Sequence, residues 1–315
     1  MDSPVSRRTF IAGLAATTTA LAQASAADDN DKGQLRIVDT HVHLWDLKRF
    51  TLPWIEKDSP LARSFVMKDY QAAIRGLNVV KGVYMEVDVS PKQLVAEAEY
   101  VLDICRQGKT PLVAAVIGGR PGADDFPKYL QRFRGNRYLK GVRQVLQNPA
   151  TKPGYCLSEN FVRGVRRLGE LNLCFDLCMR PTDLGDAVKL VEACPDTRFI
   201  LDHCGNGPLY AKDRTQWQRD MDRLARFKNT VCKVSGIVVE ARPKWTPDHL
   251  APIINHTLRA FGSERVMFAG DWPVCTLRAT FRQWVDALKT IVRERPAAEQ
   301  RRLFHDNAVR FYALA

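Results

Sequence analysis

Two histidines stand one residue apart in VDTHVHLWD, residues 38–46, directly after a short apolar run. Side chains two residues apart on a β-strand point to the same face, so His41 and His43 can direct both imidazoles to one point. Two imidazoles and a carboxylate are a suitable ligand set for a divalent ion. The pair therefore predicts either a metal site or a polar strand end, and the choice depends on partners from elsewhere in the chain.

Other polar residues lie in or directly after later apolar runs, where catalytic and binding groups of a parallel sheet collect. His203 follows the run FILD, and Asp271 follows MFAG. Each of these features alone is weak, because a single histidine at a strand end is more often not a ligand. Together with the histidine pair they predict a catalytic site. The remaining polar candidates in or near such runs are Glu86, Arg143 and Lys233.

Alternation of short β-branched runs with amphipathic helical stretches must position these residues. Eight runs are predicted as strands: 36–40, 79–87, 111–118, 139–146, 173–179, 198–203, 230–237 and 265–270. Helical patterns are predicted at 90–108, 158–172, 181–195, 246–262, 275–292 and 297–314. Eight repeats within this length indicate an α/β fold, a single-domain (β/α)8 TIM-type barrel over 35–315. An open doubly wound sheet would normally carry a glycine-rich loop after its first strand, where this chain has His-Val-His.

The barrel interpretation predicts which of these residues meet. Active sites of such barrels lie at the carboxyl ends of the strands, and the eighth strand neighbours the first. Asp271 should therefore lie beside His41 and His43 and complete a metal site. His203, from the sixth strand, can reach the same mouth. Asp39 shares a strand face with His41 and is expected to orient it.

Substrate contacts are predicted around this mouth, each with a structural alternative. Arg143 and Lys233 could grip a carboxylate or sugar hydroxyls, or form ion pairs inside the barrel. Glu86 could accept a sugar hydroxyl or pair with an arginine. Trp45 and Trp272 flank the expected ligands and could pack against a sugar face or serve only as walls. The long loop at 49–70 is expected to act as a lid that sets substrate identity.

The segments VDTHVHLWD, FILDHCGNGP, FAGDWP and NAVRFYAL, with GVR and FDL between them, resemble the amidohydrolase superfamily over nearly all of 35–315. The resemblance is to the amidohydrolase-2 branch, which includes L-fuconolactonase and pyrone-dicarboxylate lactonase. It implies that His41, His43 and Asp271 bind or face a divalent metal, that Asp271 takes a proton from water, and that His203 binds the metal or polarises the substrate carbonyl.

Two departures from the superfamily limit the cofactor prediction. The fifth strand lacks the histidine and the fourth the modified lysine that would hold a second metal, so one ion at most is expected. Two histidines and an aspartate suit zinc or manganese. The pyrone-dicarboxylate relatives work without metal, so a metal-free site is the alternative.

The function predicted from these features is hydrolysis of a lactone of a sugar acid or related polar acid, with Asp271 as general base. Three alternatives remain open: a metal-dependent decarboxylase of the same superfamily, an amide or phosphoester hydrolase, and a non-catalytic small-molecule-binding barrel. The substrate is expected to be a small polar molecule, either neutral or anionic.

Composition and the N-terminus bound the class of protein. The net charge of +12 is spread along the chain, without the concentrated basic stripe that nucleic-acid binding requires. Residues 1–26 contain Ser6-Arg7-Arg8-Thr9-Phe10, an uncharged alanine-rich run and small residues, which resemble a cleavable twin-arginine export signal. That run is too polar for a membrane span. We therefore expect a periplasmic or other extracytoplasmic protein. The eight cysteines contain no CxxC pair, and the oligomeric state is not readable.

Overall fold

The computed structural model describes Met1 and residues 34–314. The predicted export signal at 1–26 lies outside the described residues, except for Met1. Leu35–Ala315 form one compact unit. Within the described part of the chain, no helix has the length and apolar character needed to cross a membrane.

Eight parallel strands in the order β1 to β8 form the central sheet, which curls into a nearly closed TIM barrel. The predicted α/β barrel is therefore confirmed. Every strand prediction corresponds to an observed strand, although β1 runs two residues further than predicted and includes both His41 and Val42. The strands are β1 (Ile37–Val42), β2 (Val79–Met85), β3 (Leu112–Gly118), β4 (Leu139–Val145), β5 (Cys174–Cys178), β6 (Arg198–Leu201), β7 (Thr230–Val234) and β8 (Val266–Phe268).

The seam between β8 and β1 is closed largely by side chains. The hydroxyl of Thr40 donates to the carbonyl of Phe268 at 2.7 Å, and the Asp39 carboxylate accepts the backbone N–H of Gly270 at 2.7 Å. One further backbone bond joins the His43 N–H to the Trp272 carbonyl at 2.8 Å. Because β8 is only three residues long, these contacts fix the chain after β8 against the histidine-bearing end of β1.

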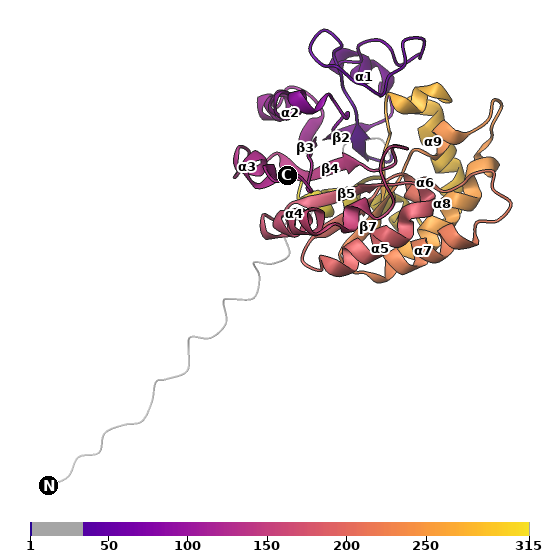
Figure 1. The fold of residues 1–315 in the computed structure, drawn as a ribbon. Helices are drawn as coiled ribbons and strands as arrows, with labels where there is room; N and C mark the ends of the chain where they lie inside the picture. The colour runs from indigo at the N-terminus through magenta and orange to yellow at the C-terminus, as the bar shows by residue number, and fades with distance from the viewer. Residues whose placement is uncertain (2–33, 315) are drawn as a thin grey trace. The chain divides into compact units, whose positions relative to one another are not determined.

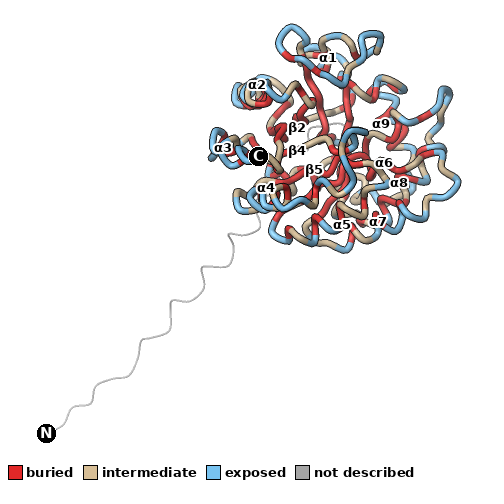
Figure 2. The backbone as a smooth tube through the Cα atoms, in the orientation of Figure 1, coloured by how far each residue is buried: buried red, intermediate tan, exposed pale blue. Residues whose placement is uncertain are grey.

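Helices surround the strands, as the ribbon shows (Figure 1), and the buried segments of the tube lie inward of the exposed helix faces (Figure 2). All six predicted helical stretches contain helix, but four of them are divided. The stretches 90–108, 181–195 and 275–292 each begin with a 3₁₀ turn followed by a helix, and 297–314 consists of three pieces. Sequence analysis missed α1, α3 and α7. The α-helices are α1 (Met67–Ala73), α2 (Leu94–Gln107), α3 (Phe126–Gln131), α4 (Glu159–Glu170), α5 (Leu184–Ala193), α6 (His203–Asn206), α7 (Thr215–Arg226), α8 (Pro247–Phe261), α9 (Phe281–Val292), α10 (Ala297–Arg301) and α11 (Asn307–Tyr312).

Short turns complete the connections. A π-helical turn, η6 (Arg302–Asp306), joins α10 to α11. The 3₁₀ turns are η1 (Pro91–Gln93), η2 (Tyr155–Leu157), η3 (Pro181–Asp183), η4 (Ile237–Glu240) and η5 (Val274–Leu277). All eight cysteines are free and buried, which agrees with their apolar sequence surroundings.

Helix α9 shows how the sequence attaches a helix to the barrel. Thr280 caps it by accepting the N–H of Gln283, and apolar residues recur at three- and four-residue spacing along one face. Trp284 is fully buried on that face and donates its indole N–H to the Ala269 carbonyl at 2.9 Å. The helix thereby supports the segment that leads from β8 into Asp271.

A buried carboxyl group beside the barrel makes stability depend on pH. Burial, and then the charge of Glu86, raise the pKa of Glu97 to about 8 from the ordinary value of 4.5. Its Oε1 accepts the Val87 N–H at 2.7 Å and the Tyr84 hydroxyl at 2.9 Å. The folded state therefore holds a proton that the unfolded chain releases above about pH 4.5. The bound proton contributes fully to the free energy of unfolding below pH 4.5, and this contribution is lost as the pH rises through about 8.

The isosteric variant Glu97→Gln tests this linkage, because its amide oxygen can accept the same two bonds without titrating. Between pH 5 and 8 the free energy of unfolding of the wild type should fall relative to that of Glu97→Gln, by on the order of a few kcal/mol. Urea denaturation of both proteins at each pH gives the difference. A difference that stays constant across this range would contradict the assignment.

Candidate active site

His41 of β1, His43 directly after this strand and Asp271 converge, as their spacing predicted. Oδ1 of Asp271 lies 3.5 Å from Nε2 of His43 and 3.7 Å from Nε2 of His41. The two imidazole ring centres are 4.8 Å apart. His43 donates its Nδ1–H to the carbonyl of Met85 at 2.9 Å, which leaves a lone pair on Nε2. All three residues are buried or nearly so.

A turn of left-handed backbone positions His203 directly after β6. His203, Cys204, Gly205 and Asn206 all have φ between 48° and 61°, so α6 is a single left-handed turn. For residues other than glycine this conformation costs roughly 1–2 kcal/mol each. Tertiary contacts must hold it, and such strain is concentrated at functional sites.

Two contacts from the residues directly after β7 fix the His203 ring. Nδ1 of His203 and the hydroxyl of Ser235 are 2.9 Å apart. A Cβ atom on Gly236 would lie 2.6 Å from Cγ and Nδ1 of His203, so only glycine leaves room for the ring there. Burial lowers the pKa of His203, and the nearby Asp271 opposes this shift. The ring is therefore neutral near pH 7 and can act as a hydrogen-bond donor.

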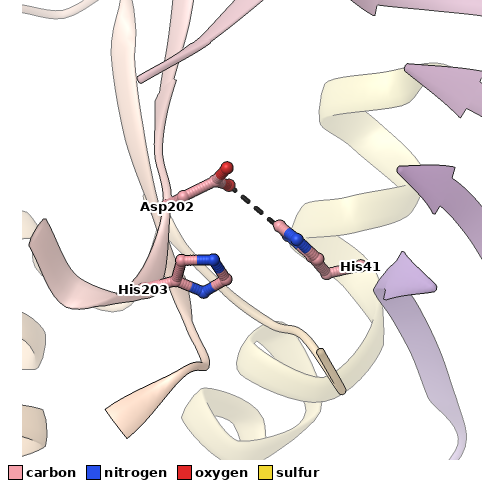
Figure 3. A group of neighbouring side chains, drawn as sticks. All are labelled: His41, Asp202 and His203. Atoms are coloured by element: carbon pink, nitrogen blue, oxygen red, sulfur yellow. Dashed lines mark ion pairs between the residues drawn. The ribbon is translucent and has the colours of Figure 1, made fainter. Parts of the chain in front are cut away.

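A buried network of charges lies beneath the histidines. Asp202 places Oδ1 3.5 Å from Nδ1 of His41 and 3.2 Å from Nζ of Lys233, and Oδ2 3.4 Å from Nη1 of Arg143. Figure 3 shows Asp202 directed toward His41, with His203 beside both. Burial alone would raise the pKa of Asp202, but Lys233 and then His41 hold it well below its ordinary range. Asp202 is therefore a permanent carboxylate that orients the His41 ring.

Arg143 contacts the opposite edge of His41. Its Nη1 lies 3.1 Å from His41 Nε2, and its Nε donates to Glu86 at 2.6 Å. An arginine can only donate, so Nε2 of His41 must be the accepting nitrogen and Nδ1 must carry the proton that faces Asp202. Burial lowers the pKa of His41 well below its ordinary value, consistent with this neutral tautomer.

The donor atoms match the requirements of a single metal ion. Nitrogen and oxygen atoms bound tetrahedrally to zinc at about 2.0–2.2 Å would lie roughly 3.3–3.6 Å apart. The three candidate atoms of His41, His43 and Asp271 all lie within 4.8 Å of one another. The Met85 carbonyl supports His43 as a ligand, because the partner of the other ring nitrogen fixes its orientation. Arg143 contacts the same lone pair of His41, so a bound ion would displace that one contact.

These residues form the base of a cavity of about 700 Å³ at the carboxyl ends of the strands. Four of the predicted site residues line it: His43, Arg143, His203 and Asp271. The predicted placement at the barrel mouth is correct for these four. His41 lies just beneath them and is fully buried.

The other predicted substrate contacts lie outside the cavity lining. Lys233 and Glu86 are fully buried and pair with Asp176 and Arg143, at 2.5 Å and 2.6 Å respectively. Both side chains therefore form the ion pairs that the sequence offered as the alternative to substrate contact.

Trp45 and Trp272 are buried in the apolar packing instead of facing substrate. Trp45 donates its indole N–H to the Arg63 carbonyl at 2.7 Å, and Trp272 packs against Phe65 and Tyr70. Asp39 holds the backbone of His41, because its carboxylate accepts the His41 N–H at 3.1 Å, whereas Asp202 is the carboxylate that faces the ring.

Sequence reasoning missed Trp54 and the role of Asp202. Trp54 belongs to the expected lid at 49–70, is 39% exposed and lines the cavity. Its indole N–H donates to the Val87 carbonyl at 2.8 Å, which fixes the ring. Its position in the long loop after the first strand is the sequence feature that could have identified it as a cavity-lining residue. Asp202 follows the end of β6 and directly precedes His203, and this position could have identified it as a site residue.

Comparisons with known proteins agree with this geometry. A family model described as amidohydrolase matches residues 38–314. An L-fucono-1,5-lactonase of Burkholderia multivorans is 29% identical, over 90% of this chain and 97% of its own. An L-rhamnono-gamma-lactonase of Scheffersomyces stipitis is 23% identical, over 88% and 98%. The crystal structure of a Burkholderia multivorans amidohydrolase with bound zinc aligns with a TM-score of 0.80 and 26% identity, covering 89% of this chain and all of that one.

Proposed function

Because this chain belongs to the amidohydrolase family, we propose that it is a hydrolase that opens the ring of a sugar-acid lactone. The observation that carries the proposal is the convergence of Asp271, His43 and His203 at the base of one cavity. The similarity to an L-fucono-1,5-lactonase and to an L-rhamnono-gamma-lactonase supports this class of substrate. The cavity holds a carboxylate, a neutral imidazole and a guanidinium in reach of one bound molecule.

In the proposed mechanism, water adds to the lactone carbonyl carbon while Asp271 accepts its proton. Oδ1 of Asp271 faces the two imidazoles, so the second carboxylate oxygen is the one available as the base. His203 donates a hydrogen bond to the carbonyl oxygen as negative charge develops there. The ring C–O bond then breaks, and Asp271 returns the proton to the leaving alkoxide. The product acid ionises and releases one proton to solvent.

We propose that a single divalent cation, zinc or manganese, is held by His41, His43 and Asp271. When bound, it supplies Lewis-acid chemistry at the base of the cavity. Arg143 and His203 remain available to hold the substrate and its carbonyl.

Removal of the metal gives a direct prediction. After dialysis against a chelator, lactone hydrolysis should fall at least about tenfold, and added zinc or manganese should restore it. Metal analysis should find close to one ion per chain in the wild type and less in His43→Ala, whose Nε2 is lost. Wild-type protein that binds neither ion, yet keeps full activity, would contradict the metal assignment while leaving the base assignment intact.

The test of the activity is acid release from a panel of sugar-acid and dicarboxylate lactones, followed with an indicator dye and corrected for spontaneous hydrolysis. Acid release that depends on the folded, metal-supplemented enzyme is the expected result. No release from any lactone would reject the proposal. Carbon dioxide evolved from an aromatic acid under the same conditions would instead identify a decarboxylase.

We further propose that residues 1–26 direct export to the periplasm. The basis is the paired Arg7 and Arg8 followed by an uncharged run and small residues. When the protein is expressed in a bacterial host, it should be recovered in the periplasmic fraction. N-terminal sequencing of that protein should find that it begins near Ala27. Replacement of both arginines by lysine should retain it in the cytoplasm. Full-length protein found only in the cytoplasm would contradict the proposal.

A further inference from the structure

A second cavity adjoins the site cavity on the side of β3 and β4. It has a volume of about 430 Å³. Three residues line both cavities, namely Asp88, Val145 and Asn148. The two cavities therefore share part of their lining, and together we call them the cleft; Asp271 lines only the site cavity.

The combined cleft is larger than a single sugar ring requires. Pockets of about 300–1,000 Å³ commonly enclose drug-sized ligands, and the site cavity alone has about 700 Å³. A six-carbon lactone at the base of this cavity would leave the outer space and the whole adjoining cavity to solvent.

Exposed aromatic side chains are concentrated along this cleft. Among the residues that the structure describes, the only exposed aromatic side chains are those of Trp54, Tyr155 and Tyr210. Trp54 and Tyr210 line the site cavity, and Tyr155 lines the adjoining one. An exposed aromatic ring can pack its face against the apolar C–H face of a sugar while polar groups bind the hydroxyls.

Each of these rings is held in place by specific contacts. Trp54 is fixed by its bond to the Val87 carbonyl. The Tyr210 hydroxyl accepts the N–H of Arg242, whose guanidinium lies 4.3 Å from the ring centre. Tyr155 packs edge-on against Phe161, with ring centres 5.4 Å apart. Rings that are already ordered lose little entropy when a ligand binds, as an evolved binding surface requires.

Hydrogen-bond donors and acceptors both lie beside the Tyr155 ring in the adjoining cavity. Arg120 donates to Asp88 at 2.8 Å, and both side chains line the cavity. Gln144 also lines it, and the buried Oε1 of Gln144 has no hydrogen-bond partner among the described residues. A buried acceptor without a donor is costly unless a ligand or water satisfies it. Mixed donors and acceptors beside one aromatic ring suit a neutral, hydroxyl-rich ring better than a phosphate or an alkyl chain.

We propose that the adjoining cavity is a subsite for a second sugar ring, so that the preferred substrate is an aldonolactone that carries a glycosyl substituent. This proposal rests on the lactonase function proposed above and specifies its substrate class. The lactone would occupy the base of the site cavity near Asp271, and the glycosyl ring would extend past Asp88 to Tyr155.

Cellobiono-1,5-lactone and D-glucono-1,5-lactone make a matched pair of probes, because they differ by one glucosyl unit. With the wild-type enzyme we expect kcat/KM to be at least tenfold higher for the disaccharide lactone. Tyr155→Ala should bring the ratio of the two values close to one, mainly through a higher KM for the disaccharide lactone. Tyr155→Phe keeps the ring and should keep the ratio. Equal values for the wild type, or a ratio that Tyr155→Ala leaves unchanged, would overturn the subsite.

A binding measurement separates failure of the subsite from failure of the proposed function. If neither lactone is hydrolysed, the lactonase proposal fails for these sugars, and calorimetry with the stable acids cellobionate and gluconate decides the subsite. Tighter binding of cellobionate to the wild type, lost in Tyr155→Ala and retained in Tyr155→Phe, would support it. Equal or undetectable binding of both acids would reject it.

Discussion

Asp271→Asn is expected to lower kcat/KM for lactone hydrolysis by about 10³-fold or more while the protein stays folded. The amide has the size of the carboxylate and can still occupy the left-handed position at φ 54°, which asparagine tolerates. It cannot accept a proton from water, and a positioned general base contributes about 10²–10⁴-fold. The variant also loses the anionic oxygen that lies between the imidazoles of His41 and His43.

The measurement is steady-state acid release, with thermal unfolding and far-ultraviolet circular dichroism to establish that the variant is folded. Asp103→Asn serves as the matched control, because it makes the same chemical change at a solvent-exposed position of α2, where the Asp103 carboxylate accepts hydrogen bonds from Arg106 and Gln107. It should retain wild-type turnover. A folded Asp271→Asn enzyme with turnover close to the wild type would remove Asp271 from the proposed mechanism.

Much of the fold could be predicted because the signal for barrel strands is local. Each strand is a short run of β-branched and apolar residues, and the closed barrel buries it from both sides. Helix α7 was missed because its sequence is dominated by polar and charged residues. Its apolar Trp217, Met221 and Leu224 do recur at helical spacing. Strand β1 extends past residue 40, where its apolar run ends, because its pairing with β2 continues to Val42.

The candidate site was predictable where topology alone determines proximity. The first and eighth strands of a barrel are neighbours, so Asp271 and His43 lie close together irrespective of the loop conformations. The left-handed turn at His203 was not predictable, because it depends on the room that Gly236 leaves and on Ser235, both of which follow β7. The sequence likewise did not show that Trp54, and not Trp45, lines the cavity. This depends on the path of the long loop after β1, which no local pattern specifies.

The depth of a charged residue within the barrel was also not readable from sequence. Arg143 aligns with Asp176 and Gly118 on the neighbouring strands, and its side chain reaches the cavity. Lys233 lies on β7 and is fully buried beneath His41, where it meets Asp176 and Asp202. From sequence alone, Arg143 and Lys233 were equally good candidates for substrate binding. In the structure, Arg143 lines the cavity, whereas Lys233 forms buried ion pairs.

Lys233→Met is expected to destabilise the protein by about 3–5 kcal/mol, because it leaves the buried Asp176 without its cation and Asp202 with Arg143 alone. Burial alone would lower the pKa of Lys233, but Asp176 and then Asp202 raise it above its ordinary value, so the buried lysine is charged. Methionine preserves the length and apolar stem of the side chain, so packing is changed little. The free energy of unfolding from urea denaturation measures the loss.

A matched surface pair provides the control for this effect. Lys189 and Asp186 are 3.5 Å apart on α5, and the lysine side chain is 62% exposed. Lys189→Met should cost less than about 1 kcal/mol, because water solvates the carboxylate that remains. The contrast between the two lysines isolates burial as the cause, since the chemical change is the same.

The double variant Lys233→Met/Asp176→Asn separates a charge partner from a substrate contact. Neutralising Asp176 removes one of the two carboxylates that Lys233 balances, so the double variant should be less destabilised than the sum of the single variants. We expect this coupling to be at least about 1 kcal/mol. If Lys233 instead contacted substrate, Lys233→Met would keep wild-type stability and only raise KM. That result would restore the role suggested by the sequence and remove the lysine from the network that orients His41.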